Sequence, residues 1–423
     1  MWNHRLPQES NHHDHREEYK VKGHLVKRSE TSWSLVFDIG LDEQGKRKQK
    51  WVTVQGTKKE AEKELNRLLH EMNSGTYIEP SRMTLAEYLE YWLEHYAKTN
   101  VAAKTLEGYA EFIRLYIVPQ LGKHPLAKLQ TAHIQAYYTY AQQQGRRRIV
   151  GGLSARSVLH QHRVLREALN QAVKWQFISK NPADAVVPPR AERTEMKVLD
   201  EAQMARLLAA AEGTRFYLPI LLAVTTGLRR GEILGLRWED INLSTGMLSV
   251  RQALGQTRQG LQFKPPKTTK SRRGVSLPAL VVEALRRHQE QQQQEKALMG
   301  PAYEDRDLVI AAPDGQPGTP NALTKGFGAL LVRKQLPRVR FHDLRHSHAT
   351  QLLRHNIHPK VVSERLGHST VNLTLDTYSH VLPGMQEEAA LRVDSALRSA
   401  LKENAKETVV PCAETSKKDT ENK

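Results

Sequence analysis

The sequence predicts a multidomain, mainly α-helical protein with small β-sheets. Three observations lead to this fold class. The chain has 423 residues, which is long for one hydrophobic core and suggests about three domains. Apolar residues alternate with a period of two near the amino terminus and recur with helical spacing over most of the remainder. An apolar share of 39%, with six Trp, indicates globular domains rather than a disordered chain.

The charge of the chain favours a polyanionic partner. Lys and Arg number 63 against 46 Asp and Glu, which gives a formal net charge of +17. Such an excess is most often found in proteins that bind nucleic acid. We find no apolar run of transmembrane length and no signal-peptide pattern, so we expect an intracellular, cytoplasmic protein without a membrane partner. Its only cysteine, Cys412, excludes a disulfide framework and a cysteine-based zinc site.

The two ends of the chain are polar. Residues 1–17 are rich in histidine, and we expect a disordered tail there rather than a metal site, because nothing around the histidines could fix a ligand geometry. Residues 402–423 are also polar and are expected to be disordered.

Residues 18–75 predict a small sheet backed by one helix. The segment 33–39 alternates in polarity, a turn follows, and a returning strand and a helix from about Lys58 to Met72 complete the unit. A basic cluster lies just after the turn and comprises Lys46, Arg47, Lys48 and Lys50. Two interpretations stay open at this point: a solvated hairpin, and a strand-based reader of DNA, since a two-stranded ribbon fits the major groove.

Residues 83–187 predict a helical domain. Two apolar stripes with helical spacing begin at Leu85 and Leu106, and we expect the second helix to end before Pro119. The aromatic residues of these stripes are interpreted as core rather than as platforms for nucleotide stacking. Two further helices are expected, over 131–144 and 154–175. The basic loop between them fits a DNA clamp and carries Arg146, Arg147 and Arg148.

A mixed α/β domain is predicted over residues 197–401, after a Pro-rich segment, 181–196, that resembles an interdomain linker. Asp200 followed by Gln203 predicts a capping box at the first helix of this domain. An apolar helix is expected over 216–226. Strand-like pieces follow at 247–252, 261–264 and 274–277.

Four short islands in the second half of the chain carry the residues that point to chemistry. They span 226–234, 266–273, 341–346 and 366–380. Two arginines in them, Arg229 and Arg345, can each present a planar guanidinium to phosphate oxygens and offset charge in a transition state. We see no acidic cluster nearby to hold Mg²⁺, so we expect cationic side chains to act without a metal or other cofactor.

The same islands supply groups that move protons and a nucleophile. His342 lies three residues before Arg345, so one helical face would present both. His342 and His368 can donate hydrogen bonds or transfer protons, and Lys267 can protonate a leaving group. Tyr378 offers a phenol that becomes a useful nucleophile only when it is positioned against a cationic site. The set as a whole indicates attack on a phosphodiester.

In these islands the chain resembles the tyrosine recombinase family, whose signature is Arg, Lys, His-x-x-Arg, His and Tyr. The mixed α/β region resembles the catalytic domain of that family, and residues 83–187 resemble its helical, SAM-like core-binding domain. Residues 18–75 resemble the arm-binding domain of integrases from phages and conjugative transposons. The resemblance implies that Tyr378 attacks DNA at a phosphate site assembled by Arg229, Lys267, His342, Arg345 and His368.

The resemblance also implies a function and partners. Such an enzyme cuts and rejoins double-stranded DNA through a 3′-phosphotyrosyl intermediate and a Holliday junction, integrating and excising a phage or other mobile element. It acts as a homotetramer on core and arm attachment sites, with an excision or directionality factor and a DNA-bending protein as further partners, in association with the nucleoid.

Several assignments had competitors. Arg230 is set aside because Arg229 follows Thr-Gly-Leu directly, and Lys270 because Lys267 has a Pro-Lys-Thr context on an expected β-hairpin. Glu232 is interpreted as a brace for Arg229. Three histidines receive no role in the chemistry: His346, His348 and His380. Alternative functions are a type IB topoisomerase, a recombinase that resolves chromosome dimers, and a DNA-binding regulator that has lost catalysis.

Overall fold

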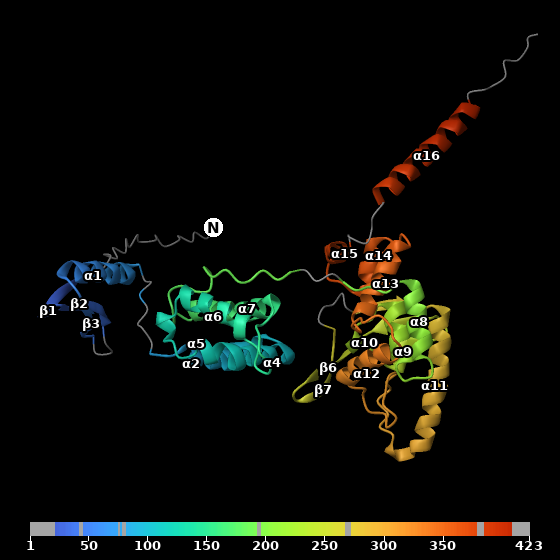
Figure 1. Cartoon of the computed structure of the whole chain (residues 1–423), viewed down its shortest axis with the longest axis horizontal. Helices are drawn as coiled ribbons and strands as arrows, with labels where there is room; N and C mark the ends of the chain where they lie inside the picture. The colour runs from blue at the N-terminus through green and yellow to red at the C-terminus, as the bar shows by residue number, and fades with distance from the viewer. Residues whose placement is uncertain are drawn as a thin grey trace, which may run out of the picture. The chain divides into compact units, whose positions relative to one another are not determined.

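The computed structural model describes residues 22–41, 45–74, 77, 82–192, 196–266, 272–378 and 385–407. The chain divides into two compact units, residues 1–193 and 194–423 (Figure 1). The division falls within the segment 181–196 that the sequence marked as a linker.

The first unit opens with a three-stranded antiparallel sheet in the order β1-β2-β3. Its strands are β1 (Gly23–Ser29), β2 (Ser32–Leu41) and β3 (Arg47–Gln55), and α1 (Lys58–Asn73) follows. A capping box at Thr57 starts α1, since its hydroxyl accepts from the backbone N–H of Glu60. The sheet backed by one helix is therefore as expected, with β1 as an additional strand.

The two faces of this sheet differ. Leu35 and Phe37 of β2 pack with Leu65 and Leu68 of α1 in a small apolar core. Val36 points to the other face by strand alternation and is nevertheless buried. The central strand of the sheet is thus covered on both faces, whereas strict alternation predicted one free face.

The remainder of the first unit is helical. Its α-helices are α2 (Leu85–Trp92), α3 (Lys98–Asn100), α4 (Ala103–Phe112), α5 (Val118–Leu121), α6 (Thr131–Gln144) and α7 (Ala155–Lys174). Two π-helical turns and one 3₁₀ turn complete it, at Leu93–Ala97, Ile113–Ile117 and Leu126–Lys128. The aromatic stripes form its core, since Tyr88 and Trp92 are fully buried. The interpretation of these aromatics as core is confirmed.

The helix that was expected to end before Pro119 continues through it. The π-helical turn at 113–117 leads directly into α5, and Pro119 lies in the first turn of that short helix. A missing backbone N–H matters little at this position, and the wider π turn relieves the clash that proline makes with the preceding turn. The sequence rule was therefore wrong here, because it assumed a regular α-helix.

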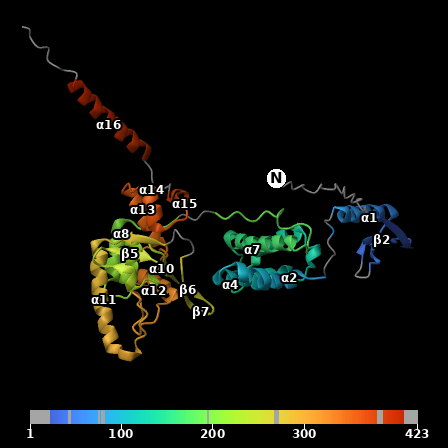
Figure 2. The ribbon, with the colours of Figure 1, turned by 180° about the vertical axis from the view of Figure 1, so that it is seen from behind.

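The second unit begins with α8 (Glu201–Ala211), which starts at the predicted Asp200–Gln203 capping box. The apolar helix α9 (Tyr217–Thr226) and the short α10 (Arg230–Leu234) follow. Later helices are α11 (Ala279–Met299), α12 (Pro320–Arg333), α13 (Asp343–Arg354), α14 (Pro359–Leu366), α15 (Val371–Tyr378) and α16 (Met385–Glu407) (Figure 2). Two 3₁₀ turns lie at Trp238–Asp240 and Gly300–Ala302.

The strands of this unit form two small sheets. One has the order β4-β5-β8 and the other pairs β6 with β7. The bounds are β4 (Ile241–Asn242), β5 (Met247–Val250), β6 (Ala253–Thr257), β7 (Gly260–Lys264) and β8 (Arg273–Ser276). Because β7 and β8 belong to different sheets, the segment around Lys267 connects two sheets and does not close the hairpin that was expected.

Two apolar clusters position the candidate site. The larger one surrounds α9, whose side chains from Leu218 to Val224 are almost all buried, and it includes Leu344 of α13. The smaller one joins α13, α14 and α15 through Ala349, Leu366 and Tyr378. Packing of α13 between α9 and the last helices therefore brings together three islands that are distant in sequence.

Candidate active site

Arg229 stands at the amino-terminal end of α10, just after the left-handed turn that ends α9 at Gly227. Its Nη1 donates to Glu232 Oε1 at 2.8 Å, and its Nη2 donates to the backbone oxygen of Gly367 at 3.2 Å. Glu232 also accepts from the backbone N–H of Arg229. The carboxylate therefore braces this arginine from two sides, as the sequence indicated.

Arg273 at the start of β8 shares that carboxylate, and sequence reasoning missed it. Its side chain is buried, donates to Glu232 Oε2 at 2.9 Å, and donates to the backbone oxygen of Arg365 at 2.7 Å. Burial alone would raise the pKa of Glu232, but hydrogen bonds and charge from Arg273, with the charge of Arg229, lower it. The basic run 270–273 was a signal, but nothing in it singled out Arg273.

Arg345 lies in the first turn of α13 with 3% of its surface exposed. It donates to the backbone oxygens of Gly227 and Leu366, at 2.7 and 2.6 Å. Burial, together with the charge of Arg229, lowers its pKa to about 9, so it still carries its charge near pH 7. Three guanidinium groups, of Arg229, Arg273 and Arg345, thus share one carboxylate, and the site keeps an excess of positive charge.

The two predicted histidines border these arginines. His342 precedes α13 and is exposed, whereas His368 follows α14, is half-buried, and hydrogen-bonds Thr374 through Nδ1 at 2.8 Å. Burial and the charge of Arg345 lower the pKa of both rings, to about 4 for His368. Both are therefore neutral near pH 7 in the DNA-free chain.

Tyr378 ends α15 and is 1% exposed, packed among Ala349, Val362 and Leu366. Burial raises the pKa of its phenol to about 12, although the charge of Arg345 acts in the opposite direction. The phenol oxygen lies 2.8 Å from Nδ1 of His346 on α13. The sequence assigned no role to His346, and its only available signal was its place four residues after His342.

The competing residues point elsewhere or lie outside the described residues. Arg230 hydrogen-bonds Thr324 and the backbone oxygen of Pro320, so its side chain turns toward α12. His348 is buried and bonds the backbone oxygen of Val224, which is the packing role expected for it. Lys267, Lys270 and His380 lie outside the described residues.

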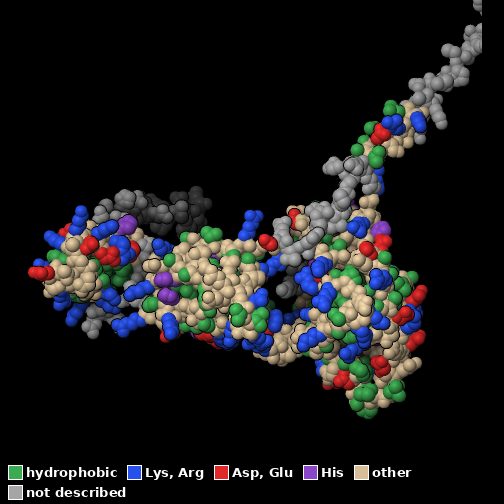
Figure 3. Space-filling model, in the orientation of Figure 1, with side chains coloured by type: hydrophobic (Ala, Val, Ile, Leu, Met, Phe, Trp, Pro, Cys, Tyr) green, Lys and Arg blue, Asp and Glu red, His purple; other side chains and the backbone are tan. Residues whose placement is uncertain are grey.

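The predicted DNA-contacting residues lie at two surfaces of the first unit. Arg146, Arg147 and Arg148 are exposed in the connection between α6 and α7. The other basic cluster starts with exposed Lys46 and continues along the edge strand β3. Strand alternation divides this cluster, since Lys50 pairs with Phe37 and so belongs to the face of the sheet that α1 covers. Lys and Arg side chains are also spread over the visible face of the second unit (Figure 3).

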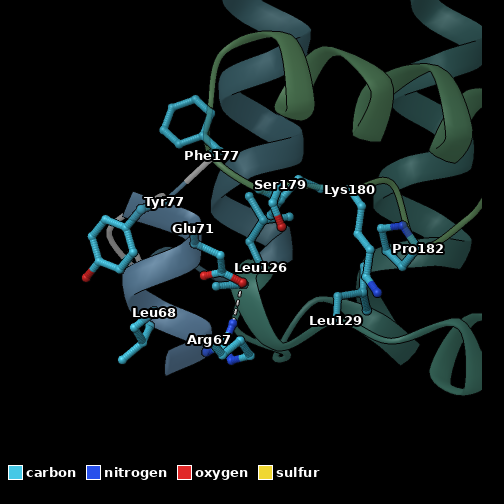
Figure 4. A pocket seen from close by; sticks show the side chains of 12 residues that line it. Arg67, Leu68, Glu71, Tyr77, Leu126, Leu129, Phe177, Ser179, Lys180 and Pro182 are labelled. Atoms are coloured by element: carbon cyan, nitrogen blue, oxygen red, sulfur yellow. Dashed lines mark hydrogen bonds and ion pairs between the residues drawn. The ribbon is translucent and has the colours of Figure 1, made fainter. Parts of the chain in front are cut away.

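A separate pocket of about 220 Å³ lies in the first unit (Figure 4). It is lined by α1, where Arg67 pairs with Glu71, and by residues 126–129 and 177–182. It contains none of the residues predicted to act in chemistry. Of the helices in the described ranges, none is long and apolar enough to cross a membrane.

The region that holds the arginine cluster matches a known family. Residues 197–385 match the model of the phage integrase family, and residues 84–141 match that of the phage integrase N-terminal SAM-like domain. The chain belongs to the phage integrase family of tyrosine recombinases. It is 29% identical over 387 residues to a protein called tyrosine recombinase XerC-like from Caldanaerobacter subterraneus subsp. tengcongensis, covering 87% of this chain and 97% of that protein. The recombinase is thus a tyrosine-type, site-specific enzyme.

Solved structures share the fold of the recombinase. The Tn1549 transposon integrase in complex with a circular intermediate DNA aligns with a TM-score of 0.63 and 20% identity, over 74% of this chain and 99% of that chain. A lambda integrase tetramer bound to a Holliday junction aligns with a TM-score of 0.51 and 20% identity, over 85% and 95%. The predicted fold class, mainly helical and multidomain with small sheets, is confirmed.

Proposed function

We propose that the enzyme integrates and excises a mobile DNA element, with Tyr378 as the nucleophile. The observation that carries the chemical assignment is the convergence of Arg229, Arg345 and His368 beside the end of α15. The charges of both arginines lower the pKa of His368, and that of Arg345 acts on Tyr378. A phosphodiester in this site would have its two non-bridging oxygens facing guanidinium groups.

In the proposed reaction the phenol oxygen of Tyr378 attacks the scissile phosphorus and forms a 3′-phosphotyrosyl bond. Lys267 protonates the departing 5′ oxygen, and His342 and His368 hydrogen-bond the phosphate. The phosphotyrosyl bond conserves the energy of the cut strand, so a 5′ hydroxyl from the partner DNA can reseal it without ATP. Because Tyr378 is buried in the DNA-free chain, DNA binding must uncover its oxygen.

The test is the Tyr378→Phe variant on a suicide substrate with a nick near the cleavage point. We expect normal DNA affinity and complete loss of the covalent protein–DNA adduct. An adduct with the Phe variant would show that another residue attacks. A recombination assay with two attachment sites separates an integrase from a topoisomerase, and adduct formation itself separates an enzyme from a DNA-binding regulator.

We further propose that residues 18–75 bind arm-type DNA sites through the sheet face opposite α1. Trp51 of β3 is 52% exposed, pairs in register with Val36, and lies 5.7 Å from the guanidinium of Arg28. An aromatic ring beside a cation on a strand surface suits contacts with bases and phosphates. The Lys46–Lys50 cluster borders the same sheet at its β3 edge.

Footprinting tests this arrangement. Trp51→Ala should abolish protection of arm sites and leave protection of core sites intact, because Trp51 is exposed and outside the apolar core. Lys58→Ala, on exposed α1, is the matched control and should retain arm protection. Arm protection that survives Trp51→Ala would place the contact on another surface.

The basic connection between α6 and α7 is proposed to hold the core site electrostatically. Replacing Arg146, Arg147 and Arg148 with Ala should weaken core binding and reduce the salt dependence by about 0.9 per lost phosphate contact. The comparison variant is Arg114→Ala, which removes an exposed arginine already paired with Glu90. Equal salt dependence in both variants would exclude a contact through this connection.

We propose a homotetramer on DNA in which α16 docks on a neighbouring protomer. Val393, Leu397 and Leu401 lie on one stripe of α16, and all are more than half exposed. A helix face of this kind is stabilised by burial against a partner. Val393→Ser with Leu397→Ser should leave single-site binding intact and remove synaptic complexes in gel-shift assays, whereas Lys402→Ser should not. Normal synapsis in the double variant would refute this docking.

A further inference from the structure

We propose that His346 is a further catalytic residue of the recombinase, whose Nδ1 accepts the phenolic proton of Tyr378 during cleavage and returns it during religation. The proposal rests on the proposed role of Tyr378 as nucleophile. It assigns the general base of the reaction to a histidine outside the set that the sequence pattern singled out.

The geometry carries the assignment. His346 Nδ1 lies 2.8 Å from the phenol oxygen of Tyr378, which is within the range expected of a general base and the proton it removes. Of the side chains that the structure describes, His346 is the one that hydrogen-bonds this oxygen. The contact joins α13 to the last residue of α15, and the two rings are 5.8 Å apart.

The position of His346 ties it to the phosphate site. It follows Arg345 directly, and its ring meets that of His342 edge to face, with centroids 5.0 Å apart. Because α13 carries both Arg345 and His346, one rigid element would position the phosphate-binding guanidinium and the base. His342 is the other imidazole near the reacting atoms, and its ring is not bonded to Tyr378.

The charges around His346 keep it able to accept a proton. Burial lowers its pKa to about 4, followed by the influence of His342, with Arg345 and Arg340 acting in the same direction and Asp343 in the opposite one. The imidazole is therefore neutral near pH 7. The phenol, whose pKa burial raises to about 12, still holds its proton and donates it to Nδ1, which leaves the imidazole proton on Nε2.

Entry of DNA changes this balance. A phosphodiester brings a negative charge into a site otherwise dominated by arginines, and that charge stabilises a protonated imidazole. The pKa of His346 therefore rises when DNA is bound, toward the range in which a general base is effective. The same charge favours loss of the phenolic proton only when a base can receive it.

The proton and electron balance of the step is closed. The O–H bond of Tyr378 breaks and an Nδ1–H bond forms on His346, while the freed oxygen pair forms the O–P bond. The bond between phosphorus and the 5′ oxygen breaks, and that oxygen leaves with its electron pair and takes a proton from Lys267. Religation runs through the same steps in reverse, so His346 then acts as the acid that protonates the departing phenolate.

Two variants separate proton transfer from positioning. His346→Ala removes both the base and the hydrogen bond, and should slow single-turnover adduct formation by roughly 10²- to 10⁴-fold. His346→Asn retains a hydrogen-bonding side-chain atom near the Nδ1 position but cannot accept the proton, so it should be slowed comparably. A wild-type rate in the Asn variant would overturn the proposal, because a hydrogen bond alone would then suffice.

A second experiment changes the nucleophile. A difluorotyrosine at position 378 has a more acidic phenol, which depends less on a base. The defect of His346→Ala should therefore shrink when difluorotyrosine replaces Tyr378. Equal defects with both nucleophiles would overturn the assignment, and this comparison holds even if the substitution weakens the fold, since both proteins share it.

Failure of this inference is distinguishable from failure of the proposed function. Tyr378→Phe, tested beside these variants, should form no adduct. If it is inactive while His346→Ala cleaves at the wild-type rate, the base assignment fails and the nucleophile assignment stands. If Tyr378→Phe still forms an adduct, both fail together.

Discussion

Arg345 donates a 2.7 Å hydrogen bond to the backbone oxygen of Gly227, a residue that precedes it by 118 positions. Its other amino group donates to the backbone oxygen of Leu366. Gly227 stands two residues before Arg229, and Leu366 stands two residues before His368. One buried guanidinium therefore holds together the three segments that supply the predicted phosphate-binding side chains, apart from Lys267.

The Gly227→Ala substitution should disrupt this arrangement. Gly227 has φ of 67°, and a Cβ there would lie 2.6 Å from Leu366 Cδ2 and 2.8 Å from His348 Cδ2. The left-handed backbone costs roughly 1–2 kcal/mol for a residue with a side chain, and the clash adds to that. We expect a lower melting temperature and slower adduct formation, because the acceptor of Arg345 is displaced.

Gly213→Ala is the matched control for that variant. Gly213 has φ of 69°, and nothing lies within 4 Å of an added Cβ. The two alanines therefore impose similar backbone strain and differ in packing. Equal losses of stability, measured by circular dichroism on heating, would mean that contact with Leu366 and His348 contributes nothing.

Loss of the shared carboxylate should be costly. Glu232→Ala leaves buried Arg273 without its carboxylate, and breaking a buried ion pair by removing one partner typically destabilises by about 3–5 kcal/mol. Glu232→Gln retains an acceptor oxygen and should lose less. Both should slow cleavage, because Arg229 loses its brace. Urea unfolding measures the stability, and adduct formation measures the rate.

An exposed pair on α16 gives the contrast. Asp394 and Arg398 pair on the helix surface with most of both side chains exposed. Asp394→Ala should therefore change stability by no more than about 1 kcal/mol. A loss in Glu232→Ala as small as in Asp394→Ala would contradict the role assigned to the buried network.

Stability should fall in acid partly through His348. Burial, followed by the charge of Arg365, lowers its pKa to about 3 from the usual 6.5. Between these values the unfolded chain binds a proton that the folded chain does not, so folding stability is lost as the pH falls from 6.5 toward 3. His348→Gln cannot titrate, and its unfolding midpoint in urea should change less between pH 7 and pH 5. Parallel pH profiles would show that His348 does not contribute.

Lys267 should matter through its proton. Lys267→Ala is expected to slow cleavage of ordinary DNA by roughly 10²- to 10⁴-fold, because the leaving 5′ alkoxide is strongly basic. A substrate with a bridging 5′ sulfur leaves without a proton, so the defect should nearly disappear there. Lys270→Ala is the control and should cleave both substrates normally. A Lys270→Ala defect that the sulfur substrate rescues would instead assign the acid to Lys270.

Local features of the fold could be predicted because they depend on neighbours in sequence. Helix α6 occupies the predicted residues, and α8 starts at the predicted capping box of Asp200. Spacing of apolar residues and caps acts within one or two turns of a helix. The same locality explains the failure at Pro119, where a π-helical turn changed the spacing on which the rule depends.

The sequence by itself determined which chemical groups the recombinase has, including Arg229, Arg345, His368 and Tyr378, and the order in which they occur. Only the tertiary structure decided how they meet. It turned Arg230 toward α12, placed Arg273 on Glu232, and set His346 against Tyr378. These contacts span from 32 to 90 positions along the chain, and the packing of α9, α13, α14 and α15 around shared apolar cores sets them. No local periodicity encodes such distances, because they follow from how separate helices fit together.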